Sequence, residues 1–116
     1  MFPYEQLEVY RKAYEANHKV YRFLKANNSI ATYIKSQLGR ASLSIMLNIA
    51  EGSAKLSFRD RRNFFITARG SVFECSSLIN FLNAEGEVPD DFNSDLYCDF
   101  DEISRMLYTM IKNLEQ

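Results

Sequence analysis

The chain has 116 residues, of which 47% are hydrophobic and 25% charged, as is typical of one soluble globular domain. Four glycines and two prolines are too few for the many turns of a β-rich fold, and no apolar run approaches the roughly 20 residues of a membrane span. The N-terminal sequence Met-Phe-Pro-Tyr-Glu has no basic region followed by an apolar segment, so we expect no signal peptide and a cytoplasmic location.

Charge is unevenly distributed along the chain, although the formal net charge is only −1. Residues 1–70 carry 12 Lys or Arg and 5 Asp or Glu, a net +7, whereas residues 71–116 carry 2 and 10, a net −8. If the two halves fold against each other, the molecule has a basic side and an acidic side. A basic side attracts phosphates, and the same polarity is equally suited to aligning subunits head to tail in a ring.

The first predicted helix spans residues 4–27, and Asn27-Asn28-Ser29 is interpreted as the turn that follows it. Its apolar stripe is predicted to contain Tyr10, Ala13, Asn17, Val20 and Leu24. Its basic residues either form a solvated face or contact phosphates; the candidates for phosphate contact are Arg11, Lys12, Arg22 and Lys25. The single histidine, His18, lacks the companion ligands that a metal site needs.

The second predicted helix, about residues 30–51, has apolar side chains on two faces. One face is a stripe at steps of three and four residues, formed by Ile30, Ile34, Leu38, Ala41, Ile45 and Ile49. The other apolar group comprises Leu43, Met46, Leu47 and Ala50. A helix with two apolar faces lies between other helices or faces another subunit, so we expect the chain to form a homo-oligomer.

A polar stripe runs along the same helix beside the apolar stripe. Four of its members lie at helical-neighbour spacing and are interpreted as a hydrogen-bonded seam that fixes helix register: Arg40, Ser44, Asn48 and Glu51. A ligand or catalytic site is the alternative, but no nucleophile is paired with a base here. A half-buried Glu51 needs a partner, and Arg69 on the following helix is the candidate.

The third helix is predicted at residues 58–84 after a short polar loop. Gly52 is interpreted as a left-handed C-cap of the second helix, and Ser57, with Asp60 three residues later, as the N-cap of the third. The inward seam of the third helix is predicted to be Phe65, Ala68, Val72, Cys75, Ile79 and Leu82. Three further residues lie off this seam and extend the apolar surface: Ile66, Phe73 and Phe81.

The densest group of basic residues lies at the start of the third helix. We call it the basic cluster; it consists of Lys55, Arg59, Arg61 and Arg62. Exposed amides and the helix dipole favour an anion at a helix N-terminus, so a phosphate site is one hypothesis. Ion pairing with acidic residues of another helix or of a neighbouring subunit is the alternative.

A fourth helix is predicted from about Phe92 or Asp95 to Leu114. The connection before it contains Gly86, which suits a helix end, and Pro89, which suits a loop or a first helical position. The apolar stripe of this helix is predicted to be Leu96, Phe100, Ile103, Leu107, Met110 and Leu114. Because three short connections make each helix return beside the last, we predict an all-α fold, an antiparallel up-down-up-down four-helix bundle, as a single domain of residues 1–116.

The remaining chemistry of the sequence points away from catalysis. Cys75 and Cys98 are too few and too far apart for a disulfide scaffold or a zinc site, so we predict two reduced thiols, Cys75 buried in the helix seam and Cys98 partly exposed. The sequence contains no phosphate loop, dinucleotide fingerprint, HExxH motif or nucleophile elbow. We therefore predict no cofactor, no metal and no catalytic residue.

Nearly the whole sequence resembles a known family, with the weakest similarity at residues 84–100. The matching residues are Gln37-Leu38-x-Arg40-Ala41-x-x-Ser44-Ile45-x-x-Asn48-Ile49-Ala50-Glu51-Gly52-Ser53, then Phe64 or Phe65, then Ala68-Arg69-Gly70-Ser71, together with the opening Tyr4-x-x-Leu7-x-Val9-Tyr10-x-Lys12-Ala13. This pattern is similar to that of the S23 or 23S rRNA intervening-sequence family. Gly39 stands where that family usually has a basic residue, and Met46-Leu47 replaces a common Pro-Ser, so the second helix should have no proline kink.

The resemblance implies a four-helix bundle that often assembles as a ring-shaped pentamer. It also implies relatedness to the accessory proteins of diversity-generating retroelements, which bind nucleic acid and a reverse transcriptase. Our first hypothesis is therefore a non-catalytic oligomeric adaptor that binds nucleic acid, in particular structured RNA, through backbone phosphates. The alternative is a protein-interaction scaffold that binds a partner protein and no nucleic acid; an enzyme is the least favoured class.

Overall fold

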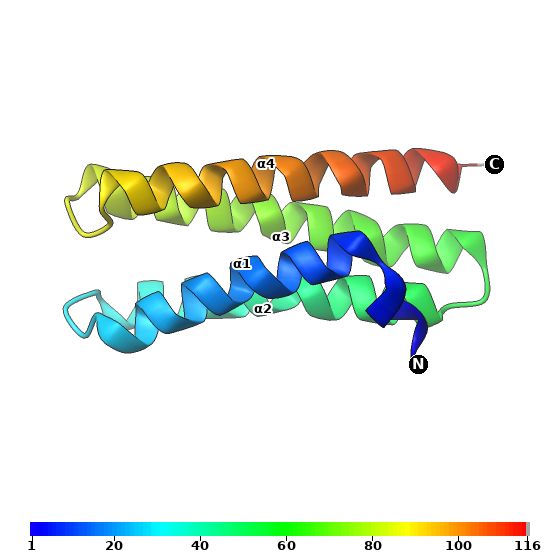
Figure 1. Ribbon diagram of the computed structural model, residues 1–116, viewed down its shortest axis with the longest axis horizontal. Helices are drawn as coiled ribbons and strands as arrows, with labels where there is room; N and C mark the ends of the chain where they lie inside the picture. Colours follow the sequence, from blue (N-terminus) through cyan, green and yellow to red (C-terminus); the bar gives the residue numbers. More distant parts are fainter. Residues whose placement is uncertain (116) are drawn as a thin grey trace.

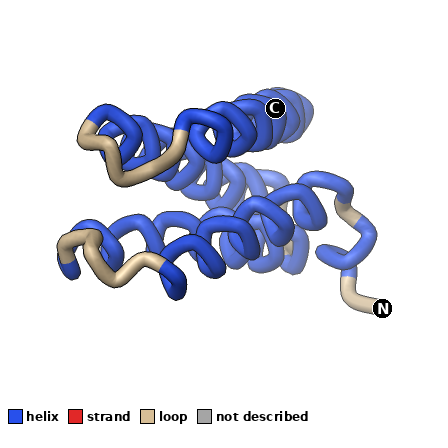
Figure 2. Tube along the Cα trace, turned by 60° about the vertical axis from the view of Figure 1, so that its left-hand side comes forward, coloured by secondary structure: helices blue, strands red, loops and turns tan. Residues whose placement is uncertain are grey.

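In the computed structural model, which describes residues 1–115, four helices form a bundle in which each helix runs antiparallel to the one before it. They are α1 (Glu8–Ala26), α2 (Thr32–Ala54), α3 (Phe58–Ala84) and α4 (Asp90–Asn113), and a short 3-10 helix (Pro3–Gln6) precedes them (Figure 1). Each helix packs against its two neighbours in cyclic order (Figure 2). The contact between α2 and α3 is the most extensive, and that between α1 and α4 the least. The predicted four-helix antiparallel bundle is confirmed.

The predicted first helix is wrong at its start, because the chain does not run as one helix from residue 4. Leu7 is extended, with φ −84° and ψ 123°, and separates the 3-10 turn from α1. Pro3 sets the first position of the 3-10 turn, and the Glu5 carboxylate accepts a hydrogen bond from the Phe2 N–H at 3.0 Å. The half-buried Leu7 packs against the core and its carbonyl accepts the first hydrogen bonds of α1, so this residue anchors the entry to the bundle.

The inward faces of α2 and α3 agree with the predicted stripes. All six predicted residues of each stripe are buried, from Ile34 at 8% exposed to Leu38, Ile49, Ala68, Cys75 and Leu82 at 0%. Ile30, however, lies in the connection before α2, which begins two residues after the predicted start. The stripe of α1 is rotated relative to the prediction: Val9, Ala13, Ala16 and Val20 are buried, whereas Tyr10, Asn17 and Leu24 lie at its edge. On α4 the first four predicted residues are buried, but Ile111 is buried in place of Met110 and Leu114, which are only partly buried.

The end of α2 differs from the prediction at Gly52. This residue is not a left-handed cap: α2 continues to Ala54, and Gly52 is a buried helical residue. A β-carbon placed on Gly52 would lie 2.7 Å from Phe65 Cε1 and 3.0 Å from Phe64 Cβ. The glycine is therefore required by the close approach of α2 and α3. The predicted N-cap is confirmed, because the Ser57 hydroxyl accepts a hydrogen bond from the Asp60 N–H at 3.1 Å.

The connection between α3 and α4 is closed by a helix-ending motif around Gly86, as predicted. Gly86 has φ +78°, its N–H donates to the Asn83 carbonyl at 3.0 Å, and the Glu87 N–H donates to the Leu82 carbonyl at 2.9 Å. The Asn83 side chain then donates to the Val88 carbonyl at 2.8 Å. The next helix starts at Asp90, two residues before the predicted boundary, with Pro89 as its N-cap.

The two thiols lie in different environments. Cys75 is completely buried in the seam of α3, whereas Cys98 on α4 is exposed, and both are free cysteines. Burial, helped by the nearby Glu74 carboxylate, raises the pKa of Cys75 from 9.0 to about 12. At neutral pH, Cys75 is thus a small apolar core residue. Within residues 1–115, no helix is long and apolar enough to cross a membrane.

This difference predicts two separate phases of thiol labelling. At pH 8, Cys98 should react with a thiol reagent at the rate of a free cysteine, whereas Cys75 should react only as the bundle opens. Stopped-flow absorbance with a chromogenic disulfide reagent, using Cys98→Ser to isolate the second phase, measures both rates. Two equally fast thiols would contradict the packing of the α3 seam.

The raised pKa of Cys75 also predicts a loss of stability in alkali. Above about pH 9 the unfolded chain releases the Cys75 thiol proton, whereas the folded chain keeps it until about pH 12. The contribution of this thiol to the free energy of unfolding is therefore complete below pH 9 and is lost as the pH rises towards 12. Urea unfolding at pH 8 and pH 10.5 should therefore show a larger stability loss in the native chain than in Cys75→Ala. Equal losses of stability in the two chains would show that folding does not raise the pKa of Cys75.

Candidate functional site

The basic cluster lies where α2 ends and α3 begins, and two of its members hold this corner together. The Arg61 Nε donates to the Lys55 carbonyl at 2.7 Å, which satisfies an acceptor at the end of α2. The Lys55 ammonium lies 5.0 Å from the centre of the Phe64 ring. Arg61 is therefore committed to a structural contact, while Lys55 keeps its charge at the surface without a carboxylate partner among residues 1–115.

The other two arginines of the cluster differ in their availability. Arg62 Nη2 lies 3.3 Å from the Glu115 carboxylate, which also accepts from Lys112 at 3.1 Å. The hydrogen bond from Lys112, together with the charges of Lys112 and Arg62, lowers the pKa of Glu115. Arg59 is exposed and forms no ion pair within the described part of the chain. The charge that the cluster offers to a ligand thus comes mainly from Arg59 and Lys55.

The basic residues of α1 are also divided between internal contacts and solvent. Lys12 pairs with Glu102 of α4 at 2.9 Å, and this hydrogen bond raises its pKa. Arg11 donates to the Glu5 carbonyl at 3.1 Å, and Lys25 lies 5.4 Å from the Tyr21 ring. Arg22 is exposed. Of the four candidates on α1, Lys12 is the one paired with carboxylates among residues 1–115, whereas Arg11, Arg22 and Lys25 are exposed.

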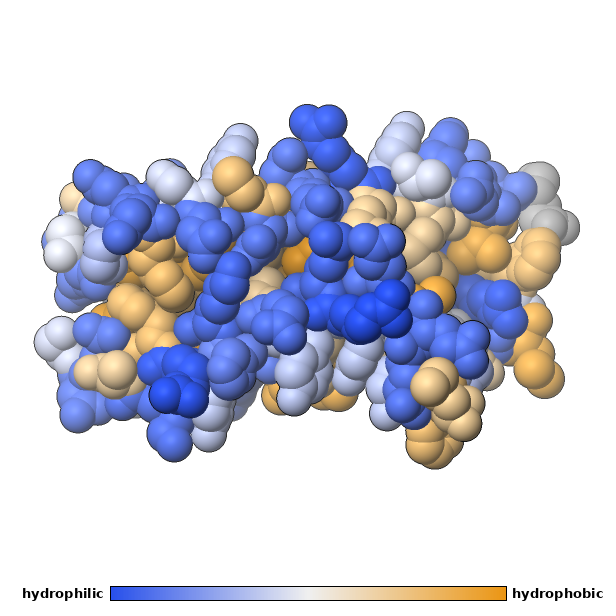
Figure 3. Space-filling model, in the orientation of Figure 1, coloured by the Kyte–Doolittle hydropathy of each residue, from blue (hydrophilic) through white to orange (hydrophobic). Residues whose placement is uncertain are grey.

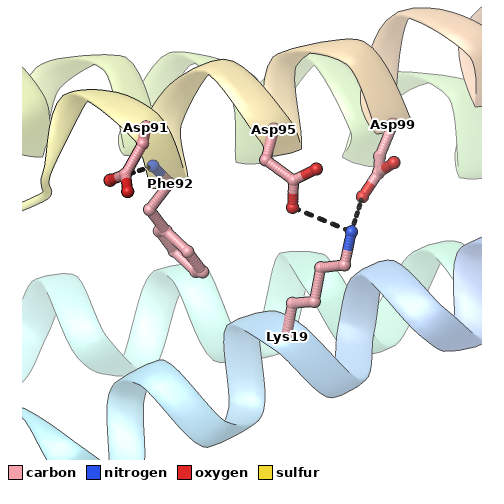
Figure 4. Close-up of polar contacts among 5 residues, drawn as sticks. All are labelled: Lys19, Asp91, Phe92, Asp95 and Asp99. Atoms are coloured by element: carbon pink, nitrogen blue, oxygen red, sulfur yellow. Dashed lines mark hydrogen bonds and ion pairs between the residues drawn. The ribbon is translucent and has the colours of Figure 1, made fainter.

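Ion pairs between Lys19 and two aspartates join α1 to α4. The Lys19 ammonium lies 2.9 Å from the Asp95 carboxylate and 2.7 Å from that of Asp99 (Figure 4), and the Asp99 hydrogen bond is the main reason for its raised pKa. Figure 3 shows hydrophilic side chains crossing the centre of the face that α1 and α4 form, with apolar patches on either side. The acidic half of the chain therefore neutralises part of the basic half within one protomer.

The predicted polar seam is partly formed. Asn48 donates to the Ser44 carbonyl at 2.8 Å and to its hydroxyl at 2.9 Å, and the Ser71 hydroxyl of α3 donates to the Ser44 hydroxyl at 2.9 Å. These contacts link α2 to α3 between the core and the surface. Arg40 and Glu51, the outer members of the seam, are both exposed.

The predicted pairing of Glu51 with Arg69 is wrong within one protomer. Glu51 lies on α2, but Arg69 is on the flank of α3 that faces α4, where its Nε donates to the Ser104 carbonyl at 3.4 Å. Its guanidinium lies 4.8 Å from the Phe73 ring and 5.5 Å from the Tyr108 ring. The sequence analysis missed these two aromatic neighbours, although Phe73 follows Arg69 by four residues, the spacing of contacts on a helix.

Apolar side chains also point outward from α2 and α3. On α2, Leu43 is 44% and Leu47 49% exposed; on α3, Ile66 is 42%, Phe73 56% and Phe81 50% exposed. These five residues, which we call the outer apolar face, belong to the surplus apolar groups that the sequence analysis identified. Among residues 1–115, no cluster of metal-ligating side chains occurs. Within one chain, large apolar side chains therefore remain in contact with solvent on both helices.

Comparisons with known proteins agree with this architecture. A solved structure, described as a protein with unknown function from the S23 ribosomal protein family of Bacteroides thetaiotaomicron, has a TM-score of 0.83 and 23% sequence identity, and the match covers 90% of this chain and 98% of that one. This likeness shows the same four-helix fold. None of the curated proteins compared matches the chain significantly. A family model described as 23S rRNA-intervening sequence protein matches residues 5–109, and the chain therefore belongs to that family.

Proposed function

We propose that this protein is a non-catalytic oligomeric adaptor, whose copies associate through α2 and α3 and whose assembled form binds nucleic acid. The observation that carries the proposal is the outer apolar face, five large apolar side chains that are each 42–56% exposed in one protomer. Large apolar side chains that remain exposed on two adjacent helices are candidate association sites in soluble proteins. The family resemblance gives five as the expected number of copies.

Self-association is tested by light scattering over about 1–100 µM protein. The native chain should show a mass of several protomers, and Leu43→Glu should shift it towards the monomer, because a charge is then buried at the contact. Tyr14→Glu is the matched control, since Tyr14 is 51% exposed on α1, outside the outer apolar face. A native chain that stays monomeric throughout this range would rule out the oligomeric adaptor.

Nucleic-acid binding is supported by the cations that remain open to solvent. Arg59 and Lys55 lie at one end of the bundle without carboxylate partners among residues 1–115, and Arg22 is exposed on α1. Repetition of these charges in an oligomer multiplies the number of phosphates that one assembly can contact. Backbone phosphates are the expected targets, so binding should show little sequence preference and should weaken strongly with salt.

Filter binding of a structured RNA hairpin across a salt series tests this part of the proposal. The double variant Lys55→Glu/Arg59→Glu should weaken binding about tenfold or more and reduce the slope of log K against log salt by about one to two units. Arg105→Glu is the control, because Arg105 is an exposed arginine of α4 that pairs with Asp101 in its own helix. Absence of RNA retention even at low salt would rule out nucleic-acid binding.

A protein-interaction scaffold is the second candidate, and the internal contacts of the basic residues favour it. Lys12 pairs with Glu102, and Arg62 pairs with Glu115, so part of the positive charge is already neutralised within the protomer. The same filter-binding assay separates the two functions. A chain that associates but retains no RNA would be a scaffold for a partner protein.

A further inference from the structure

Arg69 is held in a fixed position in the groove between α3 and α4. Its guanidinium lies between the Phe73 and Tyr108 rings, 4.8 and 5.5 Å from their centres, and its Nε donates to the Ser104 carbonyl at 3.4 Å. Three contacts restrict the side chain, so little conformational entropy is lost when it binds a ligand. A pre-positioned guanidinium is well suited to receive a carboxylate, because its planar donors match the two carboxylate oxygens.

This half-buried charge has no acidic partner among residues 1–115. The ion pairs among residues 1–115 involve other cations, and the terminal nitrogens of Arg69 form no hydrogen bond there. The surrounding cavity, about 480 Å³, contains Arg62 and Lys112 as well, against one acid, Glu115. The site therefore has an excess of positive charge and favours an anionic group.

The side chains that line this cavity indicate which kind of group should lie beside a bound anion. Ile66 and Phe73, one helical turn to either side of Arg69, supply exposed apolar surface, and nothing lies within 4 Å of the position that a Gly70 β-carbon would occupy. There is thus an opening beside the guanidinium with apolar flanks. A helix that carries a carboxylate and an apolar side chain one turn apart fits this arrangement.

The chain itself carries such a pair on the outward side of α2. Glu51 is exposed and forms no ion pair among the described residues, and Leu47, one turn before it, is 49% exposed. Several acids of α4 are, in contrast, already used: Asp95 and Asp99 bind Lys19, and Glu102 binds Lys12. Glu51 cannot reach Arg69 of its own chain, because Arg69 faces α4.

We propose that Arg69 receives Glu51 of a neighbouring copy, with Leu47 of that copy against Ile66 and Phe73. This inference rests on the proposed self-association and specifies its contact. The donor surface on α2 and the receptor groove between α3 and α4 are different surfaces of one chain, so the contact is heterologous. Copies joined in this way form a closed ring or an open filament rather than a twofold dimer.

Charge exchange tests the pairing by sedimentation velocity over a concentration series. Arg69→Glu and Glu51→Arg should each raise the apparent dissociation constant at least about tenfold, because each places like charges together at a partly desolvated contact. The combined variant Glu51→Arg/Arg69→Glu should recover a substantial part of the association. Glu51 is exposed and its side chain forms no hydrogen bond or ion pair among residues 1–115, so the single exchange should leave the fold intact, as circular dichroism can verify.

Matched charge changes on α1, Arg22→Glu and Glu15→Arg, should leave association unchanged, since both residues are exposed and outside the groove. Two results would show that the pairing is wrong while self-association stands. One is a native chain whose association neither single exchange weakens. The other is a combined variant that associates no more tightly than the single exchanges. If only Arg69→Glu weakens association, Glu51 is not the partner acid. A native chain that never associates would overturn both the pairing and the proposed function.

Discussion

Replacing Gly52 with alanine is expected to lower the free energy of unfolding by about 1–3 kcal/mol, the usual cost of an overpacked core. Alanine normally stabilises a helix relative to glycine, but here the new methyl group would lie 2.7 Å from Phe65 Cε1 and 3.0 Å from Phe64 Cβ. Phe65 is only 4% exposed, and the Phe64 Cβ is attached directly to the backbone of α3, so neither group can turn away freely. Relief of the clash therefore requires α2 and α3 to separate.

Gly39→Ala is the matched control on the same helix. A β-carbon at Gly39 would make an ordinary contact of 3.7 Å with Leu24 Cδ1, so this substitution should stabilise the chain by about 0.5–1 kcal/mol through helix propensity. Urea unfolding followed by circular dichroism, at one protein concentration for all variants, gives both values. If Gly52→Ala were as stable as Gly39→Ala, the close approach of α2 and α3 at this glycine would be incorrect.

The incorrect prediction for Gly52 shows a limit of rules that consider only the neighbouring residues in the sequence. A glycine followed by a polar loop resembles a helix C-cap, and Gly86, which has the same local appearance, does end a helix with φ +78°. What distinguishes Gly52 is the Phe64-Phe65 pair that packs against it from the next helix. That information belongs to the tertiary structure, and no residue adjacent to Gly52 in the sequence carries it.

The inward faces of α2 and α3 were predictable because their apolar residues recur at steps of three and four over long helices. The first helix is less regular: of its predicted stripe, Ala13 and Val20 are buried, but Tyr10, Asn17 and Leu24 lie at the edge. The prediction missed the buried Val9 and Ala16. Small alanines give a weak hydrophobic signal, although they allow a neighbouring helix to pack closely. The partner helix, rather than the size of the side chains, selected the buried face.

The basic cluster was visible in the sequence, but its division into structural and available charges was not. Arg59 and Arg61 look equivalent as neighbouring arginines, yet Arg61 binds the Lys55 carbonyl at 2.7 Å and Arg59 is exposed. Likewise, the pairing of Lys19 with Asp95 and Asp99 joins residues far apart in the chain. Charge counts can suggest that a protein has oppositely charged sides, but only the helix arrangement decides which charges neutralise each other.

The two apolar faces of α2 should respond oppositely to the same truncation. Leu38 is 0% exposed, so Leu38→Ala removes buried methyl groups, leaves a cavity, and should lower the free energy of unfolding by about 2–5 kcal/mol. Leu47 is 49% exposed, so Leu47→Ala should change the unfolding free energy of dilute, dissociated chains by less than about 1 kcal/mol. Urea unfolding at submicromolar concentration measures both changes.

Association should rank the same two variants in the reverse order. Leu47→Ala removes apolar surface that the proposed contact buries, and light scattering at high protein concentration should show a smaller mean mass than for the native chain. Leu38→Ala, measured at a urea concentration where it is still folded, should keep the native mass, because its outer face is unchanged. If both variants lost stability and neither lost association, both leucines would serve to stabilise the folded chain. The copies would then have to associate through a surface that does not include Leu47.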